Sequence, residues 1–339
     1  MTPQHLPPLP ALLETARVVS VPLRVRFRGV EHREALLFRG PAGWGEFCPF
    51  LEYGPAESSR WLACAIEAAF AGFPAPLREE VPVNATVPAV APERVAEVLE
   101  RFPGEVREVK VKVAERGQGL EDDVARVRAV RRAAPRAVLK MDANGGWDHG
   151  EALRAARALA EFEPAYLEQP VAGIEGLARL REALCRDGIE VPIAADESVR
   201  KEEDPVRVAR AGAADLIVVK APPLGGVRAA LEVIERAGLP AVVSSALETS
   251  VGMSAGLALA AALPELPHAC GLGTASLLTA DLVAEPLTPR DGRLPVVRAE
   301  PEPELLERHA ASPERHEWWL RRLTAAYGEL AGQQPDSPR

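Results

Sequence analysis

Hydrophobic and polar residues alternate in the N-terminal part of the chain. The alternation covers residues 17–48, where glycines and Pro41 divide it into the runs RVVSVPLRVRFRG, REALLFRG and GWGEF. A period of two is typical of strands that bury one face. A helical pattern follows at residues 58–71. We therefore predict a small α+β unit over residues 1–80.

From about Val81 the pattern changes, and short apolar runs alternate with amphipathic helical stretches. Eight runs predict strands: VPVNATV, VREVKVKV, AVLKMDAN, AYLEQP, PIAADES, LIVVKAP, AVVSSAL and HACGLGT. Strands alternating with helices favour a parallel sheet, and eight units favour closure into a (β/α)8-type barrel over residues 81–285. An open doubly wound sheet is the alternative, but the Gly-rich phosphate loop that usually follows its first strand is missing after VPVNATV.

Beyond about Glu285 the alternation ends. The proline-rich segment LTPRDGRLPVVRAEPEPELL is predicted to be irregular. HEWWLRRLTAAYGELA has a helical pattern, and its paired tryptophans are expected to pack against other residues. The final residues, GQQPDSPR, are expected to form a frayed tail. We treat residues 286–339 as a separate C-terminal segment.

Composition and charge narrow the class of protein. The chain has 339 residues, 47% of them hydrophobic and 26% charged, as in ordinary globular proteins. Its net charge of −9 disfavours nucleic acid and anionic membranes as partners. The N-terminus lacks the pattern of a secretory leader, and no apolar stretch is long enough to cross a bilayer. The four cysteines form no C-x-x-C pair. We expect a cytoplasmic protein with no obligate protein partner.

Lysine is scarce, and its positions are informative. Of 40 basic residues only five are lysines, and four lie in predicted strands: Lys110, Lys112, Lys140 and Lys220. The fifth, Lys201, is expected to be surface charge. Lysine can lose its proton when it is buried or close to other cations, whereas arginine keeps its proton. The distribution indicates proton-transfer chemistry.

Acidic residues end the strands between these lysines. Asp142, Glu168 and Asp196 follow Lys112 and precede Lys220, each about one strand-and-helix unit after the previous one. In a barrel the carboxyl ends of the strands converge on one face, so these groups should meet there. Three carboxylates without histidine or cysteine suit Mg²⁺, with Mn²⁺ as a substitute, better than zinc.

A metal flanked by two lysines suits removal of a proton from a carbon next to a carboxylate. Lys112 and Lys220 would stand on opposite sides of the metal. Lys110 shares a strand face with Lys112, and its charge would favour the neutral form of the Lys112 amine. Two other interpretations stay open. The carboxylates would be structural ion-pair partners, or Lys220 would be the Schiff-base lysine of an aldolase-type barrel.

Taken together, the motifs resemble those of the enolase superfamily, muconate-cycloisomerase subgroup, over nearly the whole chain. The resemblance rests on GWGE at residues 43–46, K-x-K at 110–112, D-A-N at 142–144, E-Q-P at 168–170, D-E-S at 196–198 and Lys220. It implies a (β/α)7β TIM-like barrel, with an α+β cap built from the N-terminal region and the C-terminal segment. It also implies Asp142, Glu168 and Asp196 as Mg²⁺ ligands and Lys112 and Lys220 as the acid/base pair.

The last two strands resemble those of the o-succinylbenzoate synthase family. This implies dehydration of 2-succinyl-6-hydroxy-2,4-cyclohexadiene-1-carboxylate in menaquinone synthesis, with Lys112 as base and then acid, and a charged Lys220 stabilising the intermediate. Small turns rich in hydroxyl and backbone N–H groups suit a carboxylate substrate. The expected substrate-binding residues are Lys110, Lys140, Ser244, Ser245, Gly271 and Gly273. Lys140, where relatives commonly carry arginine, is equally well interpreted as support for the ligand strand.

Two further functions stay open. Lysines on opposite faces also serve a racemase or epimerase of the same superfamily acting on N-acylamino acids or dipeptides, alone or beside the dehydration. The eighth strand, GLGT, offers no carboxylate to bind the ammonium group of a dipeptide, which disfavours the dipeptide epimerase. A non-catalytic barrel that only binds a ligand is the alternative from another class, and the complete set of carboxylates and lysines argues against it.

Overall fold

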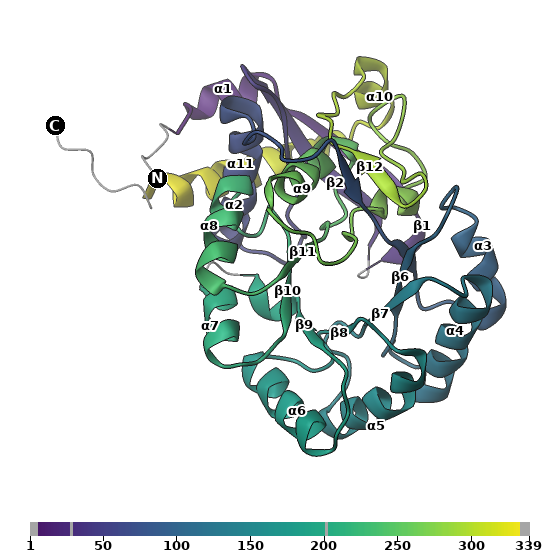
Figure 1. The fold of residues 1–339 in the computed structure, drawn as a ribbon. Helices are drawn as coiled ribbons and strands as arrows, with labels where there is room; N and C mark the ends of the chain where they lie inside the picture. The colour runs from purple at the N-terminus through teal and green to yellow at the C-terminus, as the bar shows by residue number, and fades with distance from the viewer. Residues whose placement is uncertain (1–5, 28–29, 201–202, 333–339) are drawn as a thin grey trace.

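Seven short parallel strands from the middle of the chain curl around a common axis (Figure 1). The computed structural model describes residues 6–27, 30–200 and 203–332, and within these ranges the sheet has the order β11-β10-β9-β8-β7-β6-β5. Its strands are β5 Ala85–Val87, β6 Glu108–Lys112, β7 Val138–Asp142, β8 Tyr166–Glu168, β9 Ile193–Ala195, β10 Leu216–Val219 and β11 Ala241–Val243. Seven of the eight predicted strands therefore contribute a strand to this sheet.

The eighth predicted strand closes the sheet, although it forms only isolated bridges. Cys270 pairs in parallel with Val83 before β5, and Gly271 pairs in parallel with Ser244 after β11. Asn84 N donates to the carbonyl of Cys270 at 3.0 Å, and Gly271 N donates to the carbonyl of Val243 at 2.8 Å. The predicted (β/α)7β barrel is confirmed, and its eighth strand is reduced to a bridge between the two edges.

A buried ion pair inside the barrel supports this closing segment. The Lys140 side chain is fully buried, and its Nζ donates to the carbonyl of Ala269 at 2.6 Å. The same Nζ lies 2.6 Å from Oε2 of Glu108, whose Oε1 accepts a hydrogen bond from Ala269 N at 3.1 Å. The pair, which comes from β6 and β7, thus binds both backbone groups of Ala269.

Helices surround the strands on the outside of the barrel (Figure 1). They are α3 Val95–Leu99, α4 Leu120–Ala133, α5 His149–Leu159, α6 Ile174–Arg186, α7 Asp204–Arg210, α8 Val227–Ala237 and α9 Ser250–Ala262. Most bury one face, as in α8, where Val227, Ala230, Val233 and Ile234 face the core. In contrast, α9 is buried on nearly every side because it lies between the barrel and strand β3 (Gly43–Phe47).

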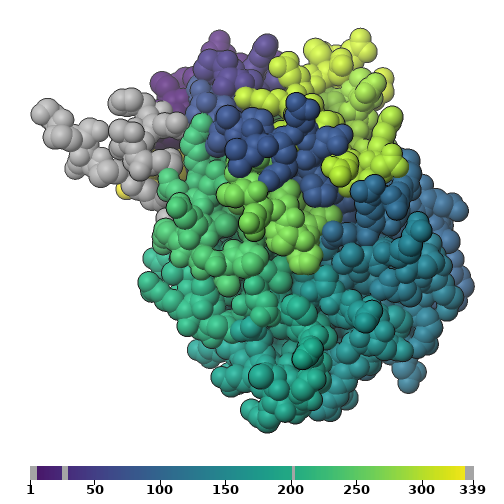
Figure 2. Space-filling view, in the orientation of Figure 1, coloured from purple at the N-terminus to yellow at the C-terminus, as the bar shows by residue number. Residues whose placement is uncertain are grey.

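The cap combines both ends of the chain, as predicted. The antiparallel strands β1 (Arg17–Phe27), β2 (Val30–Gly40) and β3 pack with helices α2 (Pro55–Ile66) and α11 (Pro313–Gly332). Smaller elements are α1 Leu9–Glu14, a π-helical turn at Glu67–Ala71 and α10 Pro303–Arg308. Figure 2 shows the N-terminal segments in purple and dark blue beside the yellow C-terminal segments, at one side of the barrel. The paired tryptophans pack as expected, because Trp319 is fully buried and its ring meets Phe47 edge-on at 5.8 Å.

The structure corrects two expectations about local structure. The predicted first strand is divided, since β4 (Glu80–Pro82) leaves the barrel and pairs antiparallel with β12 (Arg293–Pro295). The proline-rich segment is therefore not wholly irregular, because β12 lies in its middle and α10 at its end. Lys201 and residues 333–339 lie outside the described ranges. None of the described helices combines the length and the apolar character that crossing a bilayer requires.

Candidate active site

The predicted catalytic and metal-binding residues meet at the carboxyl ends of neighbouring strands. Lys112 ends β6 and is in register with Asp142 at the end of β7, which is in register with Glu168 at the end of β8. Asp196 follows β9, and Lys220 follows β10. Each of these strands is a short apolar run that ends at or just before its charged residue. The charged residues therefore lie together at the carboxyl end of the sheet.

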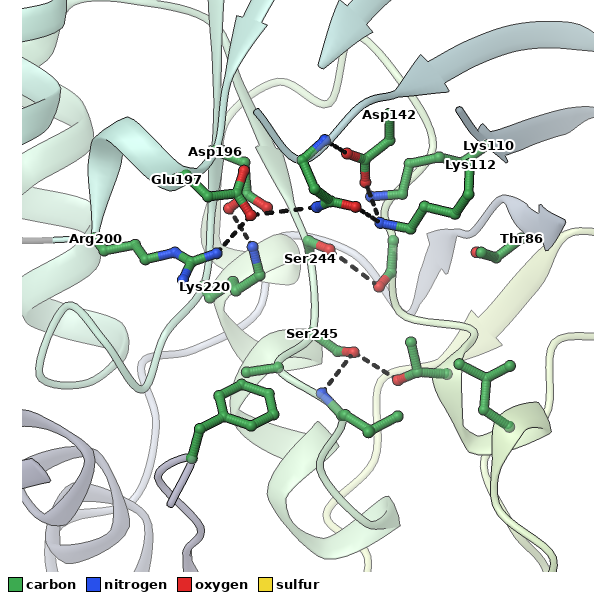
Figure 3. Close-up of a pocket in the computed structure, with 17 residues that line it drawn as sticks. Thr86, Lys110, Lys112, Asp142, Asp196, Glu197, Arg200, Lys220, Ser244 and Ser245 are labelled. Atoms are coloured by element: carbon green, nitrogen blue, oxygen red, sulfur yellow. Dashed lines mark hydrogen bonds and ion pairs between the residues drawn. The ribbon is translucent and has the colours of Figure 1, made fainter. Parts of the chain in front are cut away.

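Each carboxylate of this cluster contacts an ammonium group. Lys110 Nζ lies 3.0 Å from Glu168 Oε1 and 3.4 Å from Asp142 Oδ2. Lys112 Nζ lies 2.5 Å from Asp142 Oδ2, and Lys220 Nζ forms an ion pair with Asp196. Figure 3 shows Lys110 and Lys112 on one side of the cavity and Lys220 on the other. The lysines therefore stand on opposite sides, as the strand order predicts.

Burial and neighbouring charges set the protonation of the carboxylates. Burial, together with the nearby carboxylate of Asp142, raises the pKa of Glu168 to about 8. Burial opposes ionisation of Asp142 as well, but Lys112 and Lys110 hold its pKa below the usual range. Burial also opposes ionisation of Asp196, but Lys220 and Arg200 together with Lys110 lower its pKa. Glu168 is thus the carboxylate whose negative charge is least well compensated.

Lys110 is held as a cation in the wall of the cavity. Burial alone would lower its pKa, but the carboxylates of Glu168 and then Asp142 raise the pKa well above the usual range of lysine. Its side chain is only 9% exposed. Lys110 is therefore suited to supply a fixed positive charge beside Lys112.

The three carboxylates have the chemistry of a divalent-cation site, but in this structure the lysine ammonium groups contact them. Within the described ranges, no three acidic, histidine or cysteine side chains are grouped closely enough to hold a metal ion. The donor set nevertheless fits a hard cation, because Asp142, Glu168 and Asp196 offer only oxygen and are 1%, 0% and 5% exposed. A cation bound here would take the place of ammonium contacts, and it would compensate the charge on Glu168.

A cavity opens over this cluster. Its lining includes eight of the predicted residues: Lys110, Lys112, Asp142, Asp196, Lys220, Ser244, Ser245 and Gly271. Glu168 lies beneath Lys110, whereas Lys140 and Gly273 are absent from the lining. Of the two roles considered for Lys140, its contacts favour structural support. The lining also includes Thr274, which belongs to the predicted GLGT motif. Sequence reasoning gave no individual site role to the other lining residues Thr86, Asn144, Glu197, Arg200, Leu277 and Phe50.

Asn144 and Glu197 belong to a chain of hydrogen bonds that begins at Lys112. Lys112 Nζ donates to Asn144 Oδ1 at 2.7 Å, and Asn144 Nδ2 donates to Glu197 Oε1 at 3.2 Å. Arg200 donates to the same Glu197 oxygen at 2.6 Å and to the Tyr53 hydroxyl at 3.2 Å. Asn144 and Glu197 were visible in the D-A-N and D-E-S motifs, but Tyr53 comes from the cap and had no signal.

The seventh and eighth predicted strands contribute small polar groups to another part of the cavity wall. The hydroxyls of Ser245 and Thr274 lie 2.5 Å apart. Ser244 packs so closely on Gly271 that a Cβ there would come within 2.6 Å of the serine oxygen. Glycine at 271 therefore allows the closing strand to approach, and substrate binding at this residue stays a prediction.

Comparison with known families gives matches over most of the chain. Residues 92–301 match the family described as Enolase C-terminal domain-like, and residues 18–69 match the family described as Enolase N-terminal domain-like.

Curated relatives match the chain over nearly its full length. It is 54% identical over 326 residues to an o-succinylbenzoate synthase of Mycobacterium tuberculosis, covering 96% of this chain and 97% of the relative. It is 55% identical over 323 residues to an o-succinylbenzoate synthase of Mycolicibacterium smegmatis, covering 95% and 98%.

Solved structures share the fold at much lower sequence identity. A muconate lactonizing enzyme from Pseudomonas fluorescens, complexed with muconolactone, superposes with a TM-score of 0.74 at 24% identity, covering 88% of this chain and 98% of that one. The muconate lactonizing enzyme from Pseudomonas putida gives a TM-score of 0.71, also at 24% identity, with 87% and 98% covered. At this identity the likeness supports the fold alone.

Proposed function

Because the chain belongs to the enolase superfamily, we propose that its cavity catalyses the o-succinylbenzoate synthase reaction. In this reaction 2-succinyl-6-hydroxy-2,4-cyclohexadiene-1-carboxylate loses water on one face of the ring and becomes 2-succinylbenzoate. The chain is an enzyme of the carbon–oxygen lyase class. The observation that carries the assignment is the 54% identity to curated o-succinylbenzoate synthases over 96% of the chain.

Members of the superfamily depend on a divalent metal ion, and Mg²⁺ is the ion that we propose here, with Mn²⁺ as a substitute. Asp142, Glu168 and Asp196 would hold it, as their oxygen donors and burial support. When bound, the ion supplies positive charge beside the substrate carboxylate and so stabilises the negative charge that develops there.

Lys112 carries both proton transfers in this proposal. Its neutral amine takes the proton from the ring carbon next to the carboxylate, and the electron pair of that C–H bond moves towards the carboxylate. The bond between the ring and its hydroxyl group then breaks. The leaving hydroxide takes the proton back from Lys112 and departs as water, and the ring becomes aromatic. No oxidant or reductant is consumed.

Lys220 supports the reaction from the opposite side of the cavity without exchanging a proton. Its ammonium group forms an ion pair with Asp196. A cation at this position stabilises the negative charge on the ring and contacts its face by a cation–π interaction. Lys110 adds a second fixed charge beside Lys112.

The remaining walls of the cavity suit the carbonyl and carboxylate groups of the succinyl side chain. Ser244, Ser245 and Gly271 line the cavity and present hydroxyl or backbone groups.

We assign residues 81–285 to the barrel domain, and residues 1–80 and 286–339 to the cap. All four cysteines are free thiols, which supports a cytoplasmic location.

The test is turnover by the purified protein with Mg²⁺. Loss of the absorbance of the cyclohexadiene substrate, with 2-succinylbenzoate identified by mass spectrometry, is the expected result, and a chelator should abolish it. In parallel, exchange of the α proton of an N-succinylamino acid in D₂O measures racemase chemistry. Exchange without dehydration would replace the proposed function by a racemase, and absence of both reactions would overturn it.

A further inference from the structure

Two loops form walls of the cavity outside the lysine–carboxylate cluster. The cap loop at residues 48–54 contributes Phe50, and the barrel loop between β11 and α9 contributes Ala246 and Leu247. Figure 3 places Ser245, which belongs to this barrel loop, across the cavity from Lys110 and Lys112. A substrate whose reacting carbon meets Lys112 would therefore rest its remaining groups against these loops.

The backbone of the barrel loop is held in an uncommon conformation. Leu247 has φ of +66°, in the left-handed region that residues with a branched or bulky side chain seldom adopt. Leu247 N donates to the Ser245 hydroxyl at 3.3 Å, and Ala246 N donates to Glu248 Oε2 at 2.8 Å. Such a conformation persists only where its surroundings fix it. The contacts of the Leu247 carbonyl therefore indicate which groups fix this conformation.

A buried arginine from the cap binds this carbonyl. Arg33 lies on β2, is 4% exposed, and its Nε donates to Leu247 O at 2.9 Å. One terminal nitrogen of the same guanidinium donates to Ala246 O at 3.2 Å and to Cys48 O in the cap loop. The guanidinium carbon also lies 4.6 Å from the centroid of the Phe50 ring. Arg33 thus contacts both loops at the positions that face the cavity.

A second arginine also binds the cap loop. Arg322 of α11 donates to the carbonyls of Pro49 at 3.2 Å, Phe50 at 2.5 Å and Tyr53 at 3.0 Å. Burial and then the charge of Arg33 lower the pKa of Arg322 to about 10, which agrees with two guanidinium groups that bind the same loop. Of the two, Arg33 also reaches the barrel loop.

We propose that Arg33 is a positioning residue for substrate: it holds the Ala246–Leu247 backbone and Phe50 in the arrangement that the non-reacting part of the substrate contacts. Arg33 touches neither the lysines nor the carboxylates in the contacts described above, so it acts through the two loops. This assignment rests on the proposed function, because the substrate and product of that reaction are the probes. It predicts an effect on binding that is larger than the effect on the chemical step.

The test compares Arg33→Met with the wild-type protein in four measurements: kcat, KM, the Kd of 2-succinylbenzoate, and the affinity for Mg²⁺. Methionine fills a similar volume but donates no hydrogen bond. We expect KM and the product Kd to rise about tenfold or more. We expect kcat to stay within about threefold and Mg²⁺ affinity within about twofold, because the strand-end cluster is untouched. Arg33→Lys keeps the charge without the forked geometry and should show a smaller rise in Kd.

Arg315→Lys is the matched control. Arg315 pairs with Glu34, the neighbour of Arg33 on β2, and lies outside the cavity lining. This control should lower the unfolding temperature and leave KM and the product Kd unchanged.

Three results would overturn the assignment. The first is a folded Arg33→Met protein whose KM and product Kd stay within twofold of wild type. The second is a parallel loss of product and Mg²⁺ affinity, which would indicate general disorder. The third is failure of both Arg33 variants to fold, which would assign the residue to stability. A wild-type protein that neither converts the substrate nor binds the product would instead overturn the proposed function, and the assignment with it.

Discussion

At the scale of single residues, the centre of the site is a balance of three lysines and three carboxylates. Lys110, Lys112 and Lys220 contact Asp142, Glu168 and Asp196, so the fully ionised cluster carries no net charge. A divalent cation would leave an excess of positive charge, which is two when Lys112 is protonated and one when Lys112 is the neutral base. The proposed substrate, with a ring carboxylate and a succinyl carboxylate, carries two negative charges. Charge balance therefore favours binding of the cation and a dicarboxylate together.

Removal of one ligand charge should separate metal binding from folding. Asp196→Asn is expected to weaken Mg²⁺ binding by about tenfold or more. Because a ligand stabilises the state that binds it, Mg²⁺ should also raise the unfolding temperature of this variant less than that of the wild type. Thermal unfolding over a Mg²⁺ series measures this effect. The control is Asp281→Asn, since Asp281 is equally buried but bonds to Ser250 outside the cluster. A full Mg²⁺ response in Asp196→Asn would remove this residue from the proposed ligands.

At the scale of elements, the closing strand of the barrel depends on side chains more than on strand pairing. Cys270 and Gly271 form only bridges, and the Lys140–Glu108 pair binds both backbone groups of Ala269. Burial lowers the pKa of Lys140, so its charge is maintained against a desolvation cost by the carboxylate of Glu108. The pairing with Glu108 and Ala269 therefore accounts for the position of Lys140, which lies on the same strand as Asp142 but is not part of the cavity lining.

Lys140→Met should therefore affect stability more than catalysis. Breaking a buried pair leaves Glu108 without compensation, and we expect the free energy of unfolding to fall by about 3 kcal/mol. In the folded protein kcat/KM should stay within about threefold. The double variant Glu108→Gln, Lys140→Met should recover part of the lost stability, as denaturant titration would reveal. A tenfold fall of kcat/KM in the folded single variant would return Lys140 to the substrate-binding residues.

Spacing along the chain was sufficient to predict the residues at the strand ends, because consecutive parallel strands bring their carboxyl ends together. It could not separate Lys140 from Asp142, which share a strand face but differ in depth within the barrel. It also gave no role to Arg33, Phe50 or Tyr53. Arg33 and Tyr53 meet the barrel through docking of segments that lie 214 and 147 residues apart in sequence, and no local pattern records those contacts.

At the scale of the whole molecule, the cap and the barrel meet through a buried carboxylate. Glu46 of β3 accepts hydrogen bonds from Thr249 N at 3.1 Å, Gly252 N at 2.9 Å and the Thr249 hydroxyl, at the first turn of α9. A Cβ at residue 252 would come within 2.8 Å of the Glu46 carboxyl carbon, so glycine allows this approach. The same α9 follows the loop that Arg33 holds, which links cap docking to the shape of the cavity.

This junction should make stability depend on pH. Burial raises the pKa of Glu46 from 4.5 to about 7 in the folded protein, so the neutral form is favoured by folding. The resulting stability is fully present below pH 4.5 and is lost as the pH rises to 7, because the unfolded chain ionises first. Relative to Glu46→Gln, the wild type should lose up to about 3 kcal/mol over this interval. Denaturant unfolding of both proteins at several pH values measures the difference, and parallel pH curves would contradict the assignment.

The central claim is that the strand-end cluster dehydrates the cyclohexadiene substrate with Lys112 as the base. Its most direct test is the rate of 2-succinylbenzoate formation by wild type and by Lys112→Ala, both folded and both saturated with Mg²⁺. We predict turnover by the wild type and a loss of about 10³-fold or more in kcat for the variant, since no other group would carry the proton. A Lys112→Ala protein that forms product at a rate close to that of the wild type would contradict the account.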